Sequence, residues 1–145
     1  MIKRILTILL CLSLSTLTAW SQDTLLIDNL QQLIQQTTEE EKRLKAYNKL
    51  AYQFHTSDTS KVAHYTHQAI ELANALNDAT GKGDAHEILG LAYGYFDNPK
   101  KAVQHYQTAH QAFQSVQDTS KLVGLMNNMG RQLAELGQYE KAIQG

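Results

Sequence analysis

The fold is decided by residues 126–143, which read MNNMGRQLAELGQYEKAI. The pair Met129-Gly130 in this stretch repeats the pair Leu89-Gly90 at an offset of forty residues. Further pairs share that offset: Ala69 with Ala109, Ala102 with Ala142, Asp78 with Asp118, and Val62 with Ala102. Matched pairs at a single spacing, with no gap between them, indicate that the chain is built from internal repeats.

Each repeat unit has the pattern of two amphipathic helices joined by a short turn. In the second unit, apolar residues at helical spacing run from Ile88 to Tyr95, where the first helix is expected to end. Asn98 is a suitable N-cap for the next helix, and Pro99 suits its first turn because no N–H is needed there. The third unit repeats the plan, with a turn expected at Gly137 and a second helix after it.

The pattern divides the chain into an opening helix over residues 23–36 and three units over residues 37–78, 79–118 and 119–145. The third unit is incomplete, because the sequence ends inside its second helix. An array of helical repeats normally ends with a polar helix that shields its last apolar face. We therefore expect a partner, or a second copy of the chain, at this uncapped C-terminal end.

Residues 1–22 have the pattern of a secretory signal peptide. Two basic residues precede an apolar run over residues 5–17, and the small residues Ala19 and Ser21 follow. Thirteen helical residues cover roughly 20 Å, whereas the hydrocarbon core of a bilayer is about 30 Å thick. We therefore predict cleavage and a periplasmic or secreted protein. The alternative is that the segment stays uncleaved and anchors the protein in the membrane.

The composition argues against several classes of partner and chemistry. The net charge is −1, and no basic patch appears, so nucleic acid and anionic membrane surfaces are poor matches. The only cysteine, Cys11, lies in the predicted signal peptide, so a disulfide framework or a cysteine metal site is not expected.

The repeat motifs resemble the tetratricopeptide repeat (TPR) family. That family has a large apolar residue followed by Gly or Ala in its first helix, a Gly-x-Tyr turn, and a Lys-Ala pair that opens the second helix. Residues 126–130 and 136–143 match this pattern, and Leu89-Gly90 with Lys101-Ala102 match it in the second unit. The period of forty exceeds the usual thirty-four, as in longer-helix variants. The resemblance implies an all-α fold, a right-handed α–α superhelix of antiparallel helix pairs that is truncated at its C-terminus.

The resemblance also implies where a ligand binds. In the family, first helices line a concave face, and positions beside the apolar-Gly pair point into it. The matching residues are the candidates for a peptide groove: Glu87, Leu91, Asn127, Asn128 and Arg131. Asn128 stands where an asparagine commonly bonds ligand backbone in this family, and its amide offers both a donor and an acceptor. Solvated surface is the alternative interpretation of these residues.

No group of residues has the spacing of a catalytic or metal-binding site. His64 and His67 share a helix face, but a zinc site needs three or four ligands, and solvent-facing side chains explain the pair better. His105 and His110 are five residues apart and fall on different faces. A glycine-rich phosphate loop is also missing. We therefore predict no catalytic residues, no metal and no cofactor.

These observations favour a protein-binding or peptide-binding scaffold that is exported from the cytoplasm and is not an enzyme. The layout also resembles the N-terminal repeat regions of bacterial TPR-containing histidine kinases and transcriptional regulators. The alternative function is therefore the sensory part of a signal-transduction protein whose output domain is missing from this sequence.

Overall fold

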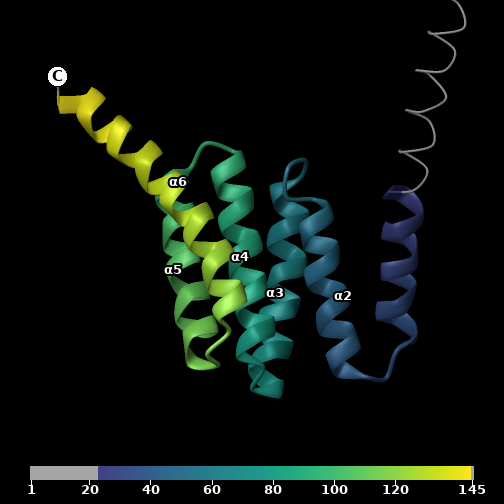
Figure 1. The fold of residues 1–145 in the computed structure, drawn as a ribbon. Helices are drawn as coiled ribbons and strands as arrows, with labels where there is room; N and C mark the ends of the chain where they lie inside the picture. Colours follow the sequence, from purple (N-terminus) through teal and green to yellow (C-terminus); the bar gives the residue numbers. More distant parts are fainter. Residues whose placement is uncertain (1–22, 145) are drawn as a thin grey trace, which may run out of the picture.

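The computed structural model describes the backbone of residues 23–144 and the side chains of residues 23–137 (Figure 1). Its helices are an opening helix over residues 23–36, α2 (Glu40–Gln53), α3 (Thr59–Leu76), α4 (Ala79–Tyr95), α5 (Pro99–Ser115) and α6 (Thr119–Gln144). Residues 23–144 contain no strand, which confirms the predicted all-α class. The predicted signal peptide, residues 1–22, lies outside the described residues.

A polar side chain caps the start of each helix from α3 to α6. Each cap accepts a hydrogen bond, 2.8–3.2 Å long, from the backbone N–H three residues further along the chain. The capping residues are Asp58, Asp78, Asn98 and Asp118. The caps recur every twenty residues, and the second unit accordingly contains two helices of seventeen residues each, α4 and α5.

A residue with left-handed backbone precedes three of these caps. These residues are Asn77, Asp97 and Gln117, with φ of 54°, 58° and 57°. A left-handed residue ends a helix and redirects the chain, so the next helix starts within two residues. The tight connections place consecutive helices antiparallel to each other (Figure 1).

The helices form two layers. Each helix from α2 to α5 packs against the next one, and α4 also contacts both α2 and α6. Among these helices, α3 and α5 do not contact each other. The helices α2, α4 and α6 are therefore neighbours on one side of the molecule, and they are the first helices of the three repeat units.

The tightest packing lies between α4 and α5. Tyr106 and Phe113 of α5 are fully buried, and their rings lie against Gly90 and Gly83 of α4. A Cβ added at either glycine would lie 2.5 Å from a ring carbon, so only glycine lets the two helices approach this closely. This contact with Tyr106 explains why the repeat pattern has a glycine at position 90.

The third unit differs from the sequence expectation. No turn occurs at Gly137, because α6 continues through it as a single helix from Thr119 to Gln144. The difference has a local cause. The turn after α4 has Asn98 as a cap and Pro99 in the next first turn, whereas the equivalent positions after α6 are Gln138 and Tyr139. Neither residue is a strong cap or a helix breaker, and a single glycine costs a helix only about 1 kcal/mol.

Candidate functional site

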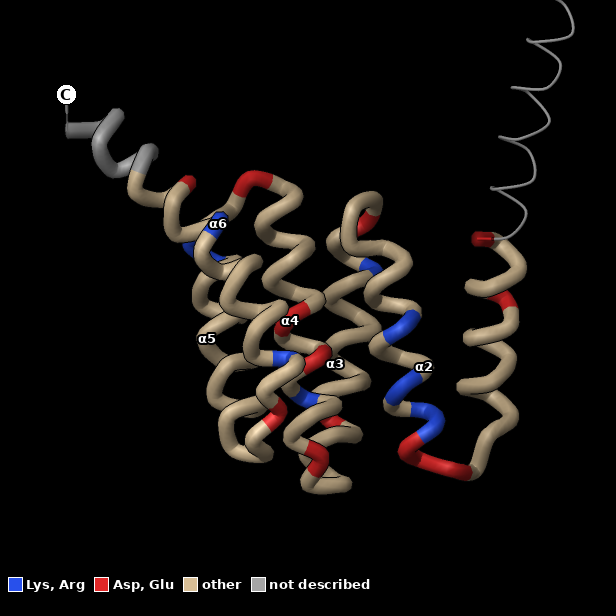
Figure 2. The backbone as a smooth tube through the Cα atoms, viewed as in Figure 1, with Lys and Arg blue, Asp and Glu red and all other residues tan. Residues whose placement is uncertain are grey.

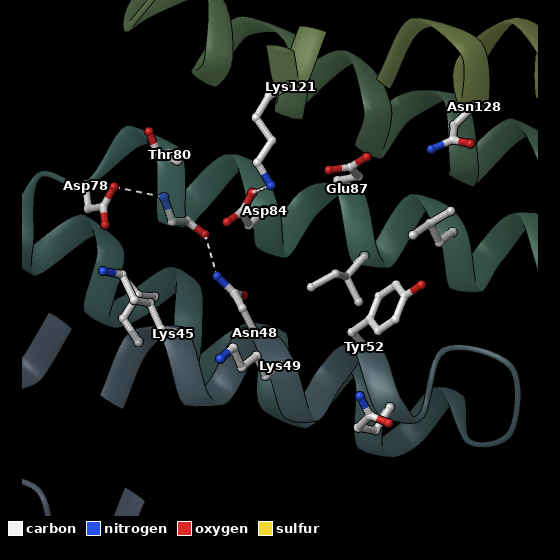
Figure 3. A pocket seen from close by; sticks show the side chains of 15 residues that line it. Lys45, Asn48, Lys49, Tyr52, Asp78, Thr80, Asp84, Glu87, Lys121 and Asn128 are labelled. Atoms are coloured by element: carbon white, nitrogen blue, oxygen red, sulfur yellow. Dashed lines mark hydrogen bonds and ion pairs between the residues drawn. The ribbon is translucent and has the colours of Figure 1, made fainter. Parts of the chain in front are cut away.

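A groove of about 620 Å³ crosses the layer formed by α2, α4 and α6 (Figure 3). Each of the three helices contributes side chains to it. The principal lining residues are Lys45, Asn48, Lys49 and Tyr52 of α2, Asp84, Glu87, Ile88 and Leu91 of α4, and Lys121 and Asn128 of α6. The groove therefore lies on the first helices of the three repeat units.

The repeat places equivalent residues of α2 and α4 in the groove. Counted at an offset of thirty-nine, Asn48 corresponds to Glu87, and Tyr52 corresponds to Leu91. The offset is one residue shorter than forty, because α2 starts nineteen residues before α3, whereas α4 starts twenty residues before α5. All four of these residues line the groove, so neighbouring first helices present the same face to it.

Asn48 joins α2 to the first turn of α4. Its Nδ2 donates a hydrogen bond of 2.9 Å to the carbonyl oxygen of Gly81. The side chain is 8% exposed, and its Oδ1 has no hydrogen-bond partner among the described residues. Asn48 therefore links α2 to α4 and leaves a buried acceptor unpaired among the described residues, where most polar groups are paired.

An ion pair links α4 and α6 at one end of the groove. The Nζ of Lys121 lies 2.7 Å from Oδ1 of Asp84, and both side chains are partly buried (Figure 3). Burial lowers the pKa of Lys121, but the hydrogen bond and the negative charge of Asp84 outweigh it, so the net shift is upward. The ammonium and the carboxylate therefore neutralise each other, and Asp84 is not free for a ligand.

Glu87 lies between this ion pair and Asn128 (Figure 3). Burial raises the pKa of Glu87, whereas the nearby charge of Lys121 and a hydrogen bond from the Asn128 amide lower it in part. Among the described side chains, Glu87 forms no ion pair. Glu87 is thus a partly buried carboxylate that has one side-chain donor, Asn128, beside it and lines the groove.

The other end of the groove is apolar. Tyr52 of α2 is 49% exposed (Figure 3), and Ile88 and Leu91 of α4 line the same groove. The ring of Tyr52 stacks on the ring of His55, with 4.6 Å between their centroids. Basic residues occupy much of α2 along this wall, as Figure 2 shows, and two of them, Lys45 and Lys49, line the groove.

The structure brings together three of the five candidate residues from the sequence. Glu87, Leu91 and Asn128 line the groove, whereas Asn127 and Arg131 are exposed on α6 and are not part of its lining. Asn128 lies near enough to Glu87 to lower the pKa of its carboxyl, so a ligand would compete with Glu87 for the Asn128 amide.

Sequence reasoning missed the α2 wall and Lys121. The α2 residues could have been found by applying the thirty-nine-residue offset to Glu87 and Leu91, which leads to Asn48 and Tyr52. No comparable signal marks Lys121, because its role depends on the contact of α6 with Asp84.

A histidine pair lies away from the groove, between α4 and α5. The Nδ1 atoms of His86 and His105 are 3.1 Å apart, and the ring of His105 also stacks on Tyr93 with 5.3 Å between centroids. Burial and the charges of His105 and Lys82 lower the pKa of His86 to about 4. One imidazole must donate and the other accept, so this contact requires at least one neutral ring.

The histidines considered in the sequence lie elsewhere. His64 and His67 are both exposed on α3, and His67 lies 3.4 Å from Glu71. Over the residues with described side chains, no three His, Cys, Asp or Glu side chains gather as metal ligands. In the same region, no helix has the length and apolar character that crossing a bilayer requires.

No protein-family model, curated protein or solved structure matches the chain.

Proposed function

We propose that this protein is a non-catalytic scaffold of the tetratricopeptide repeat type, which binds an extended peptide segment of another protein in the groove across α2, α4 and α6. The observation that carries the proposal is the composition of the groove. It is lined by the first helices of three consecutive repeat units, with repeat-equivalent residues of α2 and α4 facing it.

The architecture supports the assignment to this type of repeat. Helix pairs with the matching motif pack side by side, and the contacts of α4 with α2 and α6 form one continuous layer of first helices. On this proposal the helices belong to a right-handed superhelix of the TPR type, with α3 and α5 as its outer layer. The caps at twenty-residue intervals supply the regular geometry that such an array needs.

The lining of the groove suits a peptide. Its volume lies within the range of ligand sites, roughly 300–1,000 Å³, and it has apolar contacts at one end and polar groups at the other. An extended peptide alternates apolar and polar groups along its length and exposes N–H and C=O groups to the walls. We further propose that residues 1–22 direct export, so that the partner is met outside the cytoplasm. A sensory role within a longer signalling protein is a second proposal, which the same groove would serve.

Selection from a random dodecapeptide library displayed on phage tests the proposal. Bound sequences are expected, and the matching synthetic peptides should lose affinity for the Leu91→Arg and Tyr52→Arg variants, because each places a charged side chain in the apolar end. The matched control is Ala63→Arg, which adds the same side chain at an exposed position of α3. Circular dichroism should show unchanged helix content in all three variants.

Two results would contradict the proposed function. The first is a library that yields no binder to the purified protein. The second is a set of binders whose affinity falls with Ala63→Arg and not with the two groove variants.

A further inference from the structure

We propose that the groove selects a ligand segment that carries a lysine or arginine side chain, whose positively charged end binds Glu87. This inference rests on the proposed peptide-binding function and adds the chemistry of the residue that is recognised.

The first argument concerns which charges of the groove are already neutralised. Asp78 caps α4 by accepting from the N–H of Gly81, and Asp84 is paired with Lys121 at 2.7 Å. Among the described side chains, neither Asp78 nor Glu87 forms an ion pair, but Asp78 is engaged as the cap of α4, so Glu87 is the carboxylate left for a cation. A carboxylate accepts several hydrogen bonds, and the Asn128 amide supplies a side-chain donor on one side only.

The second argument concerns the repeat-equivalent position on the opposite wall. Asn48 occupies in α2 the place that Glu87 occupies in α4, and its Nδ2 donates to the carbonyl oxygen of Gly81. Its Oδ1 is closed to solvent and has no partner among the described residues, so it is not open to a ligand. The preference of the groove for a cation therefore rests on Glu87, which is only partly buried.

The position of Glu87 favours a long side chain with several donors at its end. Glu87 is partly buried in the lining of the groove, where an extended side chain can reach its carboxylate. Lysine carries three donors and arginine five, on stems of three or four methylene carbons. The stem can lie on Ile88 and Leu91 beside Glu87, because such stems pack well on apolar surface.

The lysines of the groove do not reverse this preference. Lys45 and Lys49 are exposed on α2, where water solvates their ammonium groups whether or not a ligand is bound. Glu87 differs from these lysines because it is partly buried. The charge of Lys121, which is paired with Asp84, offsets the desolvation of Glu87 only in part, so a cation of the ligand would offset more of it. A positive charge of the ligand is therefore expected to bind at Glu87. Lys45 and Lys49 would tolerate an acidic residue elsewhere in the ligand.

The experiment uses binders selected from the phage library on the purified protein. We expect nearly all of them to contain lysine or arginine. In a synthetic copy of one binder, replacing that residue by norleucine, which keeps the stem and removes the charge, should weaken binding about tenfold. Glu87→Gln should remove the difference between the two peptides, and selection on Glu87→Lys should enrich acidic residues instead. The matched control is Glu71→Gln on α3, 61% exposed, which should leave the tenfold difference intact.

The possible outcomes separate this inference from the function on which it rests. Binders that occupy the groove but lack basic residues would overturn the cation preference and leave peptide binding standing. A tenfold difference that persists in Glu87→Gln would also overturn it. If the library yields no groove binder of any charge, the proposed function fails and this inference fails with it.

Discussion

The helices α4 and α6 hold the same place in successive repeat units, yet one is enclosed and the other has an open face. In α4, Gly83, His86, Gly90 and Tyr93 face α5. Forty residues on, the equivalent residues of α6 are Val123, Met126, Gly130 and Leu133, which are all at least partly exposed. The face has the same helical position in both units, but within the part of the chain that the structure describes a second helix covers it only in α4.

The two glycines at this face show what the repeat motif requires. A Cβ at Gly90 would meet the ring of Tyr106 at 2.5 Å, whereas a Cβ at Gly130 would have no atom within 4 Å in the described structure. The glycine of the motif is therefore required by the partner helix and not by the helix that contains it. Val123, Met126 and Leu133 are 64%, 56% and 46% exposed, so the face of α6 keeps the apolar character of a covered surface.

The largest expected effect comes from filling these two positions. Gly90→Leu should destabilise the protein by about 2–3 kcal/mol, because the new side chain must displace the buried ring of Tyr106. Gly130→Leu should be neutral or stabilise by up to about 1 kcal/mol, because leucine is the better helix former and the site is open. Urea unfolding of both variants measures the difference. Equal destabilisation by the two variants would mean that a partner or second copy covers α6 in solution.

Sequence patterns predicted the part of the fold that depends on local chemistry. The start of α5 was predictable because Asn98 and Pro99 act within their own turn. The prediction that a turn at Gly137 ends α6 was wrong, because it relied on the family pattern although the residues after Gly137 lack a cap. In the groove, the family resemblance pointed to Glu87 and Leu91. The ion pair of Asp84 with Lys121 joins two helices, so the spacing of residues along the sequence could not predict it.

The second effect concerns the histidine of α4 that is replaced by Met126 in α6. Burial lowers the pKa of His86 from 6.5 to about 4, so the unfolded chain binds more protons than the folded one between these values. The contribution of neutral His86 to the free energy of unfolding is therefore complete above pH 6.5 and is lost as the pH falls toward 4. Since the ring is only half-buried, we expect a loss of about 1 kcal/mol between pH 7 and pH 5, less than the full shift would give.

His86→Met, which copies the residue of α6 into α4, tests this assignment. The free energy of unfolding, measured with urea at pH 7 and pH 5, should fall less in the variant than in the parent protein. The matched control is His64→Met, at an exposed position of α3, which should keep the parent's pH dependence. A variant as acid-sensitive as the parent would show that His105 or the carboxylates control the loss.

The smallest expected effect lies in the turns that precede the two helices. Asn77 leads into α4 and Gln117 into α6, and both have left-handed backbone, with φ of 54° and 57°. Asparagine tolerates this conformation better than glutamine, and glycine adopts it without steric cost. Gln117→Gly should therefore stabilise the protein by about 0.5 kcal/mol, because relief of the backbone strain slightly exceeds the entropy that glycine adds to the unfolded chain. Asn77→Gly should change the stability less. A shift of the urea midpoint without a change of slope would show the gain, whereas destabilisation by Gln117→Gly would mean that the glutamine side chain itself holds the turn.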